Sequence, residues 1–310
     1  MPRILAVTLN PAIDISSEAD RVQPTLKVRT RNQSRYPGGG GTNVARVIAT
    51  LGGTPDLAYL SGGATGALYE ELLRDGNIRQ HRFPMAGPVR ISLMVREETT
   101  GLEYRFIPEG PEVSGEEISP VMDHVTSFQG DFLVASGSLP LGVPLDTYAR
   151  MADAAAARSV RFVLDTSGEA LRATLSRSHV FLLKPSLREL ESFAGKALDE
   201  AGVCATASGI VAQGAAEHVV VSMGRQGALL ANADGIVRVP SIRVKEVSAV
   251  GAGDSFVGAM TWWLAQGRPV EEAFRFGVAA GAAAVMTPGT ELCRREDVER
   301  LYAQTVSGTD

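Results

Sequence analysis

The chain has little of what disulfide frameworks and zinc sites require. Its 310 residues include two cysteines, Cys204 and Cys293, and four histidines scattered along the sequence. Two cysteines cannot build a disulfide framework, and neither they nor the histidines follow the spacing of zinc ligands. Both thiols are therefore expected to be reduced, as is usual in the cytoplasm.

Long apolar runs and dense basic segments are also missing. No apolar run is long enough to span a bilayer, and the N-terminal run, broken by Asn10 and Pro11, lacks the pattern of a signal peptide. A net charge of −5 without a Lys/Arg-rich run argues against a nucleic-acid surface. We therefore expect a cytoplasmic protein with small-molecule ligands, and with neither a membrane nor a nucleic acid among its partners.

Three common nucleotide and hydrolase motifs are absent. The pattern G-x-x-x-x-G-K-[ST] does not occur, so no nucleotide is held by a P-loop. The absence of G-x-S-x-G weakens a serine hydrolase assignment. Because no G-x-G-x-x-G follows the first apolar run, a dinucleotide-dependent oxidoreductase has little support.

What the sequence does contain is an alternation of short apolar runs and amphipathic stretches. Buried strands, each followed by a turn and a helix, are expected at Ile4–Leu9, Leu57–Ser61, Phe132–Ser136, Arg161–Asp165, Val180–Leu183 and His218–Ser222. Helices of the last third are expected at Ala252–Gln266, Val270–Met286 and Glu296–Thr305. This order predicts an α/β fold with a mostly parallel central sheet flanked by helices.

Two polar, alternating stretches, 15–36 and 89–107, interrupt this order and are hairpin-like. We expect them to form a small second sheet that projects as a lid, with an ordinary surface hairpin as the alternative. The apolar alternation of Ile91, Leu93 and Val95 should not be stable if it is exposed. A homodimer that pairs two lids is therefore predicted.

The most informative segment runs from Ser248 to Ala259, in which Gly251 and Gly253 precede Asp254 at the start of an apolar helix. Glycines let the backbone approach a ligand, and the first helical N–H groups favour a phosphate. Asp254 is within plausible reach of a hydroxyl that loses its proton as it attacks phosphorus. For an isolated run of this kind, an aspartate that only caps the helix would be the favoured interpretation.

A second glycine cluster, Pro37-Gly-Gly-Gly-Gly-Thr-Asn43, precedes a helix expected at Val44–Leu51, with Thr42 or Asn43 as its cap. A flexible loop is the alternative. Close approach of a sugar, with Asn43 offering a donor and an acceptor to hydroxyls, explains the composition better. Asp14 follows the first strand at the edge where open α/β sheets bind ligands, although a lone aspartate there is as often an Asx-turn residue.

Several motifs occur together in an order typical of one kinase family. They are PGGGGTN, SGSLP (Ser136–Pro140), LLKPS (Leu182–Ser186), VVVSMGRQGAL (Val219–Leu229) and AVGAGDS (Ala249–Ser255). On these motifs the sequence resembles, nearly from end to end, the PfkB (ribokinase-like) carbohydrate kinases. TLNPAID, SGSLP and DTSGEAL look like the phosphosugar kinases of that family. PGGGG with GGATG is most similar to the minor bacterial 6-phosphofructokinases, close to the 1-phosphofructokinases and tagatose-6-phosphate kinases.

The resemblance implies one ribokinase-like kinase domain over residues 1–310. It implies an enzyme that uses ATP and Mg²⁺ to phosphorylate a phosphorylated ketohexose, with fructose 6-phosphate converted to fructose 1,6-bisphosphate as the first choice. Fructose 1-phosphate and tagatose 6-phosphate are the alternative substrates. A catalytically weak binding protein that senses sugar phosphates is an alternative of a different class.

The resemblance also implies roles for single residues. Asp254 would be the catalytic base, and the backbone of Gly251, Ala252 and Gly253 the anion hole. The sugar and its phosphate would be bound by Asp14, Gly39, Asn43, Arg90, Arg105 and Ser138, and by Lys27 and Arg29 across a dimer. The nucleotide side would be formed by Lys184, Ser186, Glu189, Ser222, Gly224 and Gly227, with Glu189 reaching Mg²⁺ through water.

Three positions depart from the pattern of the family. Ala12 replaces a hydroxyl residue that similar kinases carry. Ser186 stands where the family usually has asparagine, so the affinity for magnesium or phosphate could differ. Glu291 stands where the closest kinases carry arginine, near a monovalent-cation site. Activation by K⁺ is therefore left open.

Overall fold

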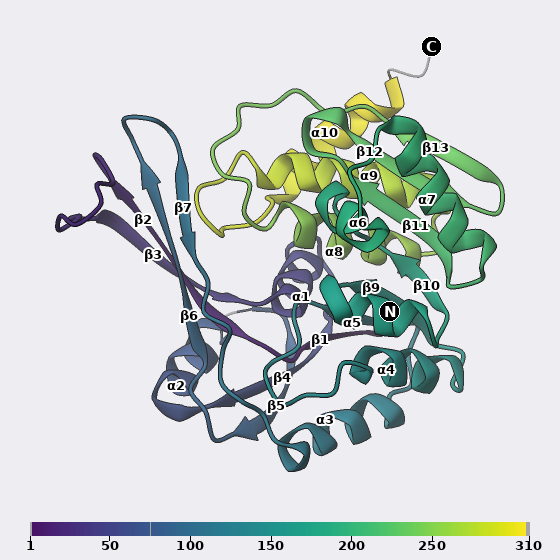
Figure 1. Ribbon diagram of the computed structural model, residues 1–310, viewed down its shortest axis with the longest axis horizontal. Coiled ribbons are helices and arrows are strands. Elements are labelled where there is room, and N and C mark those ends of the chain that lie inside the picture. The colour runs from purple at the N-terminus through teal and green to yellow at the C-terminus, as the bar shows by residue number, and fades with distance from the viewer. Residues whose placement is uncertain (1, 75, 308–310) are drawn as a thin grey trace.

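The central element of the computed structural model, which describes residues 2–74 and 76–307, is a large sheet (Figure 1). Nine strands lie in the order β13-β12-β11-β10-β9-β8-β1-β4-β5. Their bounds are β1 (Ile4–Thr8), β4 (Asp56–Gly62), β5 (Arg79–Met85), β8 (Phe132–Ser136), β9 (Arg161–Asp165), β10 (Val180–Leu183), β11 (Ala216–Ser222), β12 (Ala228–Asn232) and β13 (Gly235–Val239). All neighbours from β11 to β5 are parallel, whereas β12 and β13 add an antiparallel edge. The predicted α/β fold with a mostly parallel sheet is confirmed.

Helices cover both faces of this sheet. Their bounds are α1 (Gly40–Thr50), α2 (Gly63–Leu72), α3 (Gly115–Ser127), α4 (Thr147–Ala156), α5 (Gly168–Leu175), α6 (Leu187–Ala194), α7 (Glu200–Ala212), α8 (Ala252–Ala265), α9 (Val270–Ala284) and α10 (Arg295–Ser307). Helices α1, α8, α9 and α10 pack on one another, and α3 to α7 contact each other in series. No helix among the described residues is long and apolar enough to cross a membrane.

Three strands of the large sheet were not predicted. β5 and β13 form its two edges, and the sequence of β5, RQHRFPM, is too polar to stand out as a buried strand. Edge strands carry such residues because one side of their backbone is not covered by a neighbour. The run that ends β11 is followed by β12 rather than by a helix, which the strand–turn–helix pattern had predicted.

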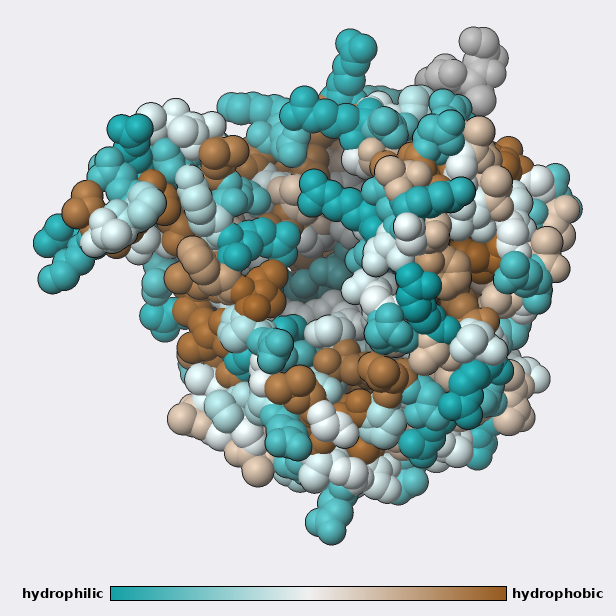
Figure 2. All heavy atoms as spheres, viewed as in Figure 1, coloured by the Kyte–Doolittle hydropathy of each residue, from teal (hydrophilic) through white to brown (hydrophobic). Residues whose placement is uncertain are grey.

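The predicted lid is a four-stranded sheet in the order β3-β2-β6-β7, made of β2 (Ala12–Ala19), β3 (Arg31–Gly38), β6 (Arg90–Glu97) and β7 (Glu103–Phe106). It projects from the large sheet, and the surface is hollowed between the two (Figures 1 and 2). Strands β2 and β6 are parallel, so the lid joins two distant segments and is not a simple hairpin. Asp14 lies within β2, so the alternative interpretation of Asp14 as an Asx-turn residue was wrong.

The two faces of the lid differ in polarity. Arg105 lies opposite Met94, and both line the hollow. Leu93 lies opposite Phe106, and these two side chains are 36% and 57% exposed. Val95 is 7% exposed, so it does not extend the outer apolar face as its alternation predicted.

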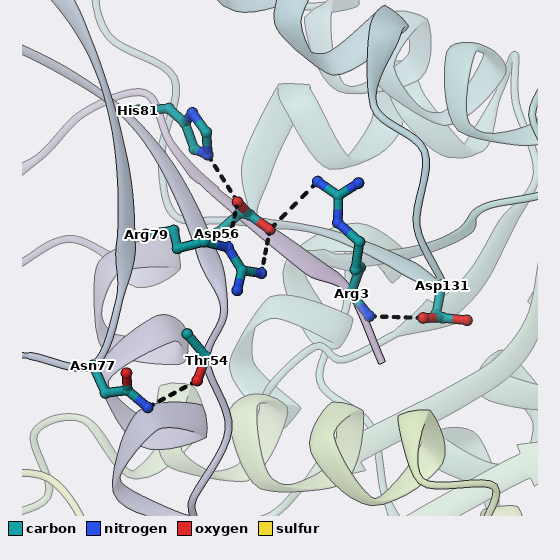
Figure 3. A network of polar contacts seen from close by, with 7 residues as sticks. All are labelled: Arg3, Thr54, Asp56, Asn77, Arg79, His81 and Asp131. Atoms are coloured by element: carbon teal, nitrogen blue, oxygen red, sulfur yellow. Dashed lines mark hydrogen bonds and ion pairs between the residues drawn. The ribbon is translucent and has the colours of Figure 1, made fainter. Parts of the chain in front are cut away.

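A buried carboxylate joins the amino ends of three neighbouring strands (Figure 3). Asp56 begins β4 and accepts hydrogen bonds from Arg79 of β5 at 2.8 and 3.1 Å, while the Nε2 atom of His81 lies 2.8 Å from its Oδ1. Arg3, before β1, lies 3.8 Å from the same carboxylate. Burial alone would raise the pKa of Asp56, but the hydrogen bonds from Arg79 and His81 hold that pKa below its usual range.

Replacing this carboxylate should destabilise the fold. Because the pKa of Asp56 is depressed, its stabilising effect is present above the pKa of the unfolded chain and is lost as the pH falls through the folded value. Asp56→Asn should lower the free energy of unfolding by about 1–3 kcal/mol at pH 7. Urea denaturation between about pH 7 and pH 3 should show the difference from wild type shrinking with acid. Asp146→Asn, which removes an exposed ion pair with Arg177, is the control and should cost less than about 1 kcal/mol. An equal loss in both variants would contradict the assignment.

Candidate active site

A cavity of about 260 Å³ lies between the lid and the carboxyl ends of the parallel strands (Figure 2). Open α/β sheets bind their ligands at this edge. Nine of the predicted site residues line the cavity: Asp14, Gly39, Asn43, Arg90, Arg105, Ser138, Glu189, Gly251 and Asp254. They come from the lid, from the loop after β8, and from the beginnings of α1, α6 and α8.

Helix α1 begins four residues earlier than predicted. Its N-cap is Gly39, with φ of 99°, and no side chain caps it, so neither Thr42 nor Asn43 is the cap. The reason is the approach of the helix to the sheet. A Cβ atom on Gly40 would lie 2.3 Å from the Ser136 Oγ, so only glycine lets the first turn approach this close.

Helix α8 brings Asp254 to the floor of the cavity. Its N-cap is Gly251, in the left-handed region with φ of 76°, and no side chain caps the helix. The capping interpretation of Asp254 was therefore wrong. The carboxylate instead accepts a hydrogen bond of 2.9 Å from the Nδ2 of Asn43 on α1.

The electrostatic environment of Asp254 makes its carboxyl a weak acid. Burial, and to a lesser degree the negative charge of Asp165, raises the pKa of Asp254 to about 7. The hydrogen bond from Asn43 and the charge of Lys184 act in the opposite direction. A carboxyl with this pKa can accept a proton near neutral pH, which is what general base catalysis requires.

The first N–H groups of α8 form the candidate anion site. The N–H of Ser255 bonds to the carbonyl of Gly251 at 2.8 Å, while the N–H groups of the residues before it precede the first intrahelical bond. Gly251 lines the cavity, whereas Ala252 and Gly253 do not. A Cβ atom on Gly251 would lie 2.5 Å from a methyl carbon of Leu292, so the close packing of this turn also depends on glycine.

The lid side of the cavity combines one carboxylate with two arginines. Burial raises the pKa of Asp14 to about 6, although Arg46, Ser92, Arg90 and Arg105 oppose that shift. Arg90 donates to the carbonyls of Pro108 at 2.8 Å and Asn10 at 3.1 Å, which fixes its guanidinium at the cavity wall. Two cations in one small cavity favour an anionic ligand.

The basic residues predicted to act across a dimer lie elsewhere. Lys27 and Arg29 are exposed between β2 and β3 and do not line the cavity. Within one chain they contribute nothing to the site.

The nucleotide-side residues lie at the ends of β10 and β11. Lys184 is buried and its Nζ is 3.1 Å from the Oδ1 of Asp165. Burial lowers the pKa of Lys184, but the carboxylates of Asp165 and Glu189 outweigh burial, so the pKa is raised and the ammonium stays charged. Ser186 and Ser222 face each other in a parallel bridge. A 3₁₀ turn (Gly224–Gln226) follows Met223, and Gly227 comes directly after it. Both serines and both glycines lie outside the lining of the cavity.

Ser186 has a clear local role. It is the N-cap of α6, and its N–H and Oγ–H both donate to the Oε2 of Glu189, at 2.7 and 2.8 Å. The Glu189 N–H donates back to the Ser186 Oγ at 3.3 Å. This reciprocal capping box orients the Glu189 carboxylate, which lines the cavity.

Sequence reasoning missed several polar residues of this region, among them Ser92, Asp165 and Thr290, which line the cavity, and Arg46, which lies behind Asn43. Asp165 had a usable signal, because it is a carboxylate at the carboxyl end of a predicted buried strand. Arg46 had a weaker one, as an arginine inside the otherwise apolar stretch Val44–Leu51. Ser92 lies at the cavity because of the register in which β6 pairs with β2, and Thr290 because of the path of the loop before α10. Neither is visible in the local sequence.

The donor set fits magnesium. Asp165 and Glu189 are two carboxylates that line the cavity near Lys184, and no cluster of three or more His, Cys, Asp or Glu side chains suited to a metal occurs in the parts of the chain that the structure describes. Mg²⁺ keeps several waters and is often held by one or two carboxylates together with substrate phosphates. Two carboxylates therefore suffice.

Comparison with known proteins supports a kinase. The sequence is 43% identical over 312 residues to the ATP-dependent 6-phosphofructokinase isozyme 2 of Mycobacterium tuberculosis, covering all of this chain and 91% of that protein. It is 34% identical to the 1-phosphofructokinase of Bacillus subtilis, covering 97% and 98%. Phosphofructokinase-2 from Escherichia coli, solved with substrates and products, superposes with a TM-score of 0.94 at 39% identity over 98% and 99% of the two chains. That E. coli protein has also been solved with potassium and in a tetrameric inhibited form.

The match to the family covers nearly the whole chain. Residues 6–297 match the pfkB family of carbohydrate kinases, and they include the lid strands, the glycine-rich start of α1 and the first turn of α8. With a ribokinase-like fold and full-length relatives that are sugar kinases, the chain belongs to the PfkB family of carbohydrate kinases.

Proposed function

We propose that this kinase transfers the γ-phosphoryl group of ATP to fructose 6-phosphate and forms fructose 1,6-bisphosphate. The observation that carries the proposal is the composition of one cavity. It holds a buried carboxyl with a pKa of about 7, Asp254, together with Arg90 and Arg105. A proton acceptor beside two cations suits a substrate that carries both a reactive hydroxyl and a phosphate. The name of the M. tuberculosis relative, 43% identical, agrees with this substrate.

Different residues of the cavity carry out different parts of the phosphoryl transfer. Asp254 orients the attacking hydroxyl and accepts its proton, and the N–H groups at the start of α8 stabilise charge on the transferring phosphoryl oxygens. Arg90 and Arg105 hold the phosphate that the sugar already carries. Closure of the lid excludes water, which would otherwise accept the phosphoryl group.

Magnesium would be held by Asp165 and Glu189, the latter through water. When bound, it neutralises charge on the phosphates of ATP. Potassium is a second proposed ion, because the E. coli relative has been solved with it. In this chain Glu291 accepts hydrogen bonds from Arg294 at 2.6 and 2.8 Å, so its carboxylate is already paired.

The alternative substrates differ in which carbon carries the phosphate. Fructose 1-phosphate is favoured by the name of the B. subtilis relative at 34% identity, and tagatose 6-phosphate shares the same functional groups. A sensing protein without useful turnover is less well supported, because Asp254, Asn43 and the glycines of α8 are all present. Like its substrates, the enzyme is expected in the cytoplasm, as one domain over residues 1–310.

A homodimer through the lid is part of the proposal. The outer face of the lid exposes Ile91 at 42%, Leu93 at 36% and Phe106 at 57%. Water-exposed apolar side chains on one small sheet favour association with a second copy. In such a dimer Lys27 and Arg29 would reach toward the partner's cavity.

The substrate proposal predicts a preference for phosphorylated ketohexoses. With Mg-ATP, fructose 6-phosphate should be turned over at least about 100-fold more efficiently than fructose or ribose, because two arginines are left unpaired without a phosphate. ADP release with product identification on fructose 6-phosphate, fructose 1-phosphate, tagatose 6-phosphate and the free sugars measures this. Equal turnover of a free sugar would refute the proposal, and a preference for fructose 1-phosphate would select the alternative.

The role of Asp254 predicts opposite effects on rate and stability. Asp254→Asn should lower kcat by about 10²–10⁴-fold, because the proton acceptor is lost. With a folded pKa raised to about 7, the neutral carboxyl stabilises the fold below the unfolded pKa, and that stability is lost as the pH rises through about 7. The asparagine variant should therefore be about 2–4 kcal/mol more stable than wild type at pH 8. The stability difference should vanish near pH 4.

Turnover and urea denaturation of the same protein check this pair of effects. Asp123→Asn, on the exposed side of α3, is the control and should change neither. Near-wild-type turnover of Asp254→Asn would end the assignment of a catalytic base.

The dimer proposal predicts that a charge on the outer lid face separates the subunits. Ile91→Asp should give a monomer by light scattering at concentrations where wild type is a dimer, because a buried carboxylate at the interface lacks a partner. Ile236→Asp, on β13 with almost the same exposure of 41%, is the matched control. A wild-type protein that stays monomeric at every concentration and is fully active would disprove this arrangement.

A further inference from the structure

Arg46 lies behind the catalytic aspartate and connects three parts of the molecule. It is on α1, three residues after Asn43. Its Nη1 donates to the Oδ1 of Asn43 and to the carbonyl of Pro37, both at 3.1 Å. Both terminal nitrogens lie 3.5 Å from the carbonyl of Thr290. Its Cζ is 5.2 Å from the centre of the Tyr36 ring.

The contact with Asn43 determines which way that amide points. A guanidinium has five donors and no acceptor, so it can face only the oxygen of the amide. The Nδ2 group of Asn43 must then point the other way, to the Oδ2 of Asp254 at 2.9 Å. The Asn43 amide therefore directs its N–H group at Asp254, because Arg46 occupies the oxygen side of the same amide.

Without Arg46 the amide would be free to rotate. A rotated Asn43 would present Oδ1 to Asp254, and an acceptor favours the protonated carboxyl over the carboxylate. The base would then be held in its inactive form. The other groups that face Asp254 are Asp165 from β9, Lys184 from β10 and Asp14 from β2. None of them is hydrogen-bonded to the Asn43 amide in the described part of the chain.

The remaining contacts of Arg46 reach the lid and the loop before α10. Tyr36 and Pro37 belong to lid strand β3, where Tyr36 lies opposite Asp14. Thr290 lines the cavity, and a Cβ atom on its neighbour Gly289 would lie 2.4 Å from the Oγ of Ser16 on β2. A shift of β2 or β3 would therefore change the contacts of Arg46 with Tyr36, Pro37 or Thr290. Arg46 forms no ion pair within 4.0 Å among the described residues, so its charge is not neutralised by one carboxylate.

We propose that Arg46 is a positioning residue: it orients the Asn43 amide so that Asp254 stays ionised, and it links this orientation to the seating of lid strand β3. The inference rests on the proposed function, since it assumes that Asp254 is the base. Arg46 itself touches neither substrate nor the reacting atoms.

A double-mutant cycle tests the route through Asn43. Arg46→Met keeps an unbranched apolar stem and removes every donor, and it should lower kcat about 10-fold with saturating substrates. In an Asn43→Ala background the same substitution should change kcat by less than about 2-fold, because the amide through which it acts is gone. The acidic limb of the profile of kcat against pH should move to higher pH in Arg46→Met.

Conservative and control variants separate positioning from folding. Arg46→Lys keeps a cation and a single donating nitrogen, so it should restore part of kcat and shift the acidic limb less. Arg161→Met removes an arginine that lies over Phe132 and Phe181 at the amino end of β9, opposite the cavity end of the strand, and should leave kcat and its pH profile unchanged. If Arg46→Met does not fold, the pH profile of Arg46→Lys alone decides, and an unshifted limb overturns the proposal.

The outcomes also separate this inference from the proposed function. A fully active Asp254→Asn would remove the base and the inference together. An inactive Asp254→Asn, with equal loss from Arg46→Met in both Asn43 backgrounds and no shift of the acidic limb, would overturn only the role of Arg46.

Discussion

The burial of the Asp254 carboxylate is the constraint around which the cavity is arranged. Removing a carboxylate from water is costly, and the neighbouring Asp165 and Asp14 add repulsion, which is why its pKa is raised to about 7. Neighbouring groups lower the pKa of Asp254 but do not bring it back to its ordinary value. One donor from Asn43, the nearby Lys184 ammonium and the positive end of α8 keep the carboxylate accessible near neutral pH. A complete ion pair would have made it a weaker base.

The close packing of two helix beginnings makes this arrangement possible. Helix α1 starts against β8, where Gly40 leaves no room for a side chain beside Ser136, and α8 starts against Leu292 at Gly251. Both glycine-rich turns therefore allow close packing, of α1 against Ser136 and of α8 against the Leu292 side chain. Asn43 and Asp254, 211 residues apart in the sequence, come within hydrogen-bonding distance because the two helices pack against each other.

The lid carries the second half of the site and a separate surface. Its inner face presents Asp14, Ser92 and Arg105 to the cavity, while its outer face presents Leu93 and Phe106 to solvent. The alternation of the strands thus gives the lid one face toward the cavity and one toward solvent, because successive side chains of a strand point to opposite faces. A change that shifts the register by one residue would exchange the two faces.

Much of this protein followed from sequence alone. The apolar runs predicted six strands of the parallel sheet, since a strand covered by helices on both faces must be continuously apolar. The anion site at the turn before Asp254 was also predicted from the sequence, because the free N–H groups at a helix start favour a phosphate. What only the tertiary structure decided depends on contacts between distant segments. The parallel pairing of β2 with β6 moved Asp14 from a turn into the lid, and the crossing of α1 with α8 made Arg46 a neighbour of the base. Ser186, which differs from the family pattern, proved to orient Glu189 through a capping box whose geometry depends on where α6 begins. No local pattern encodes these contacts, because each depends on where the chain returns after many residues.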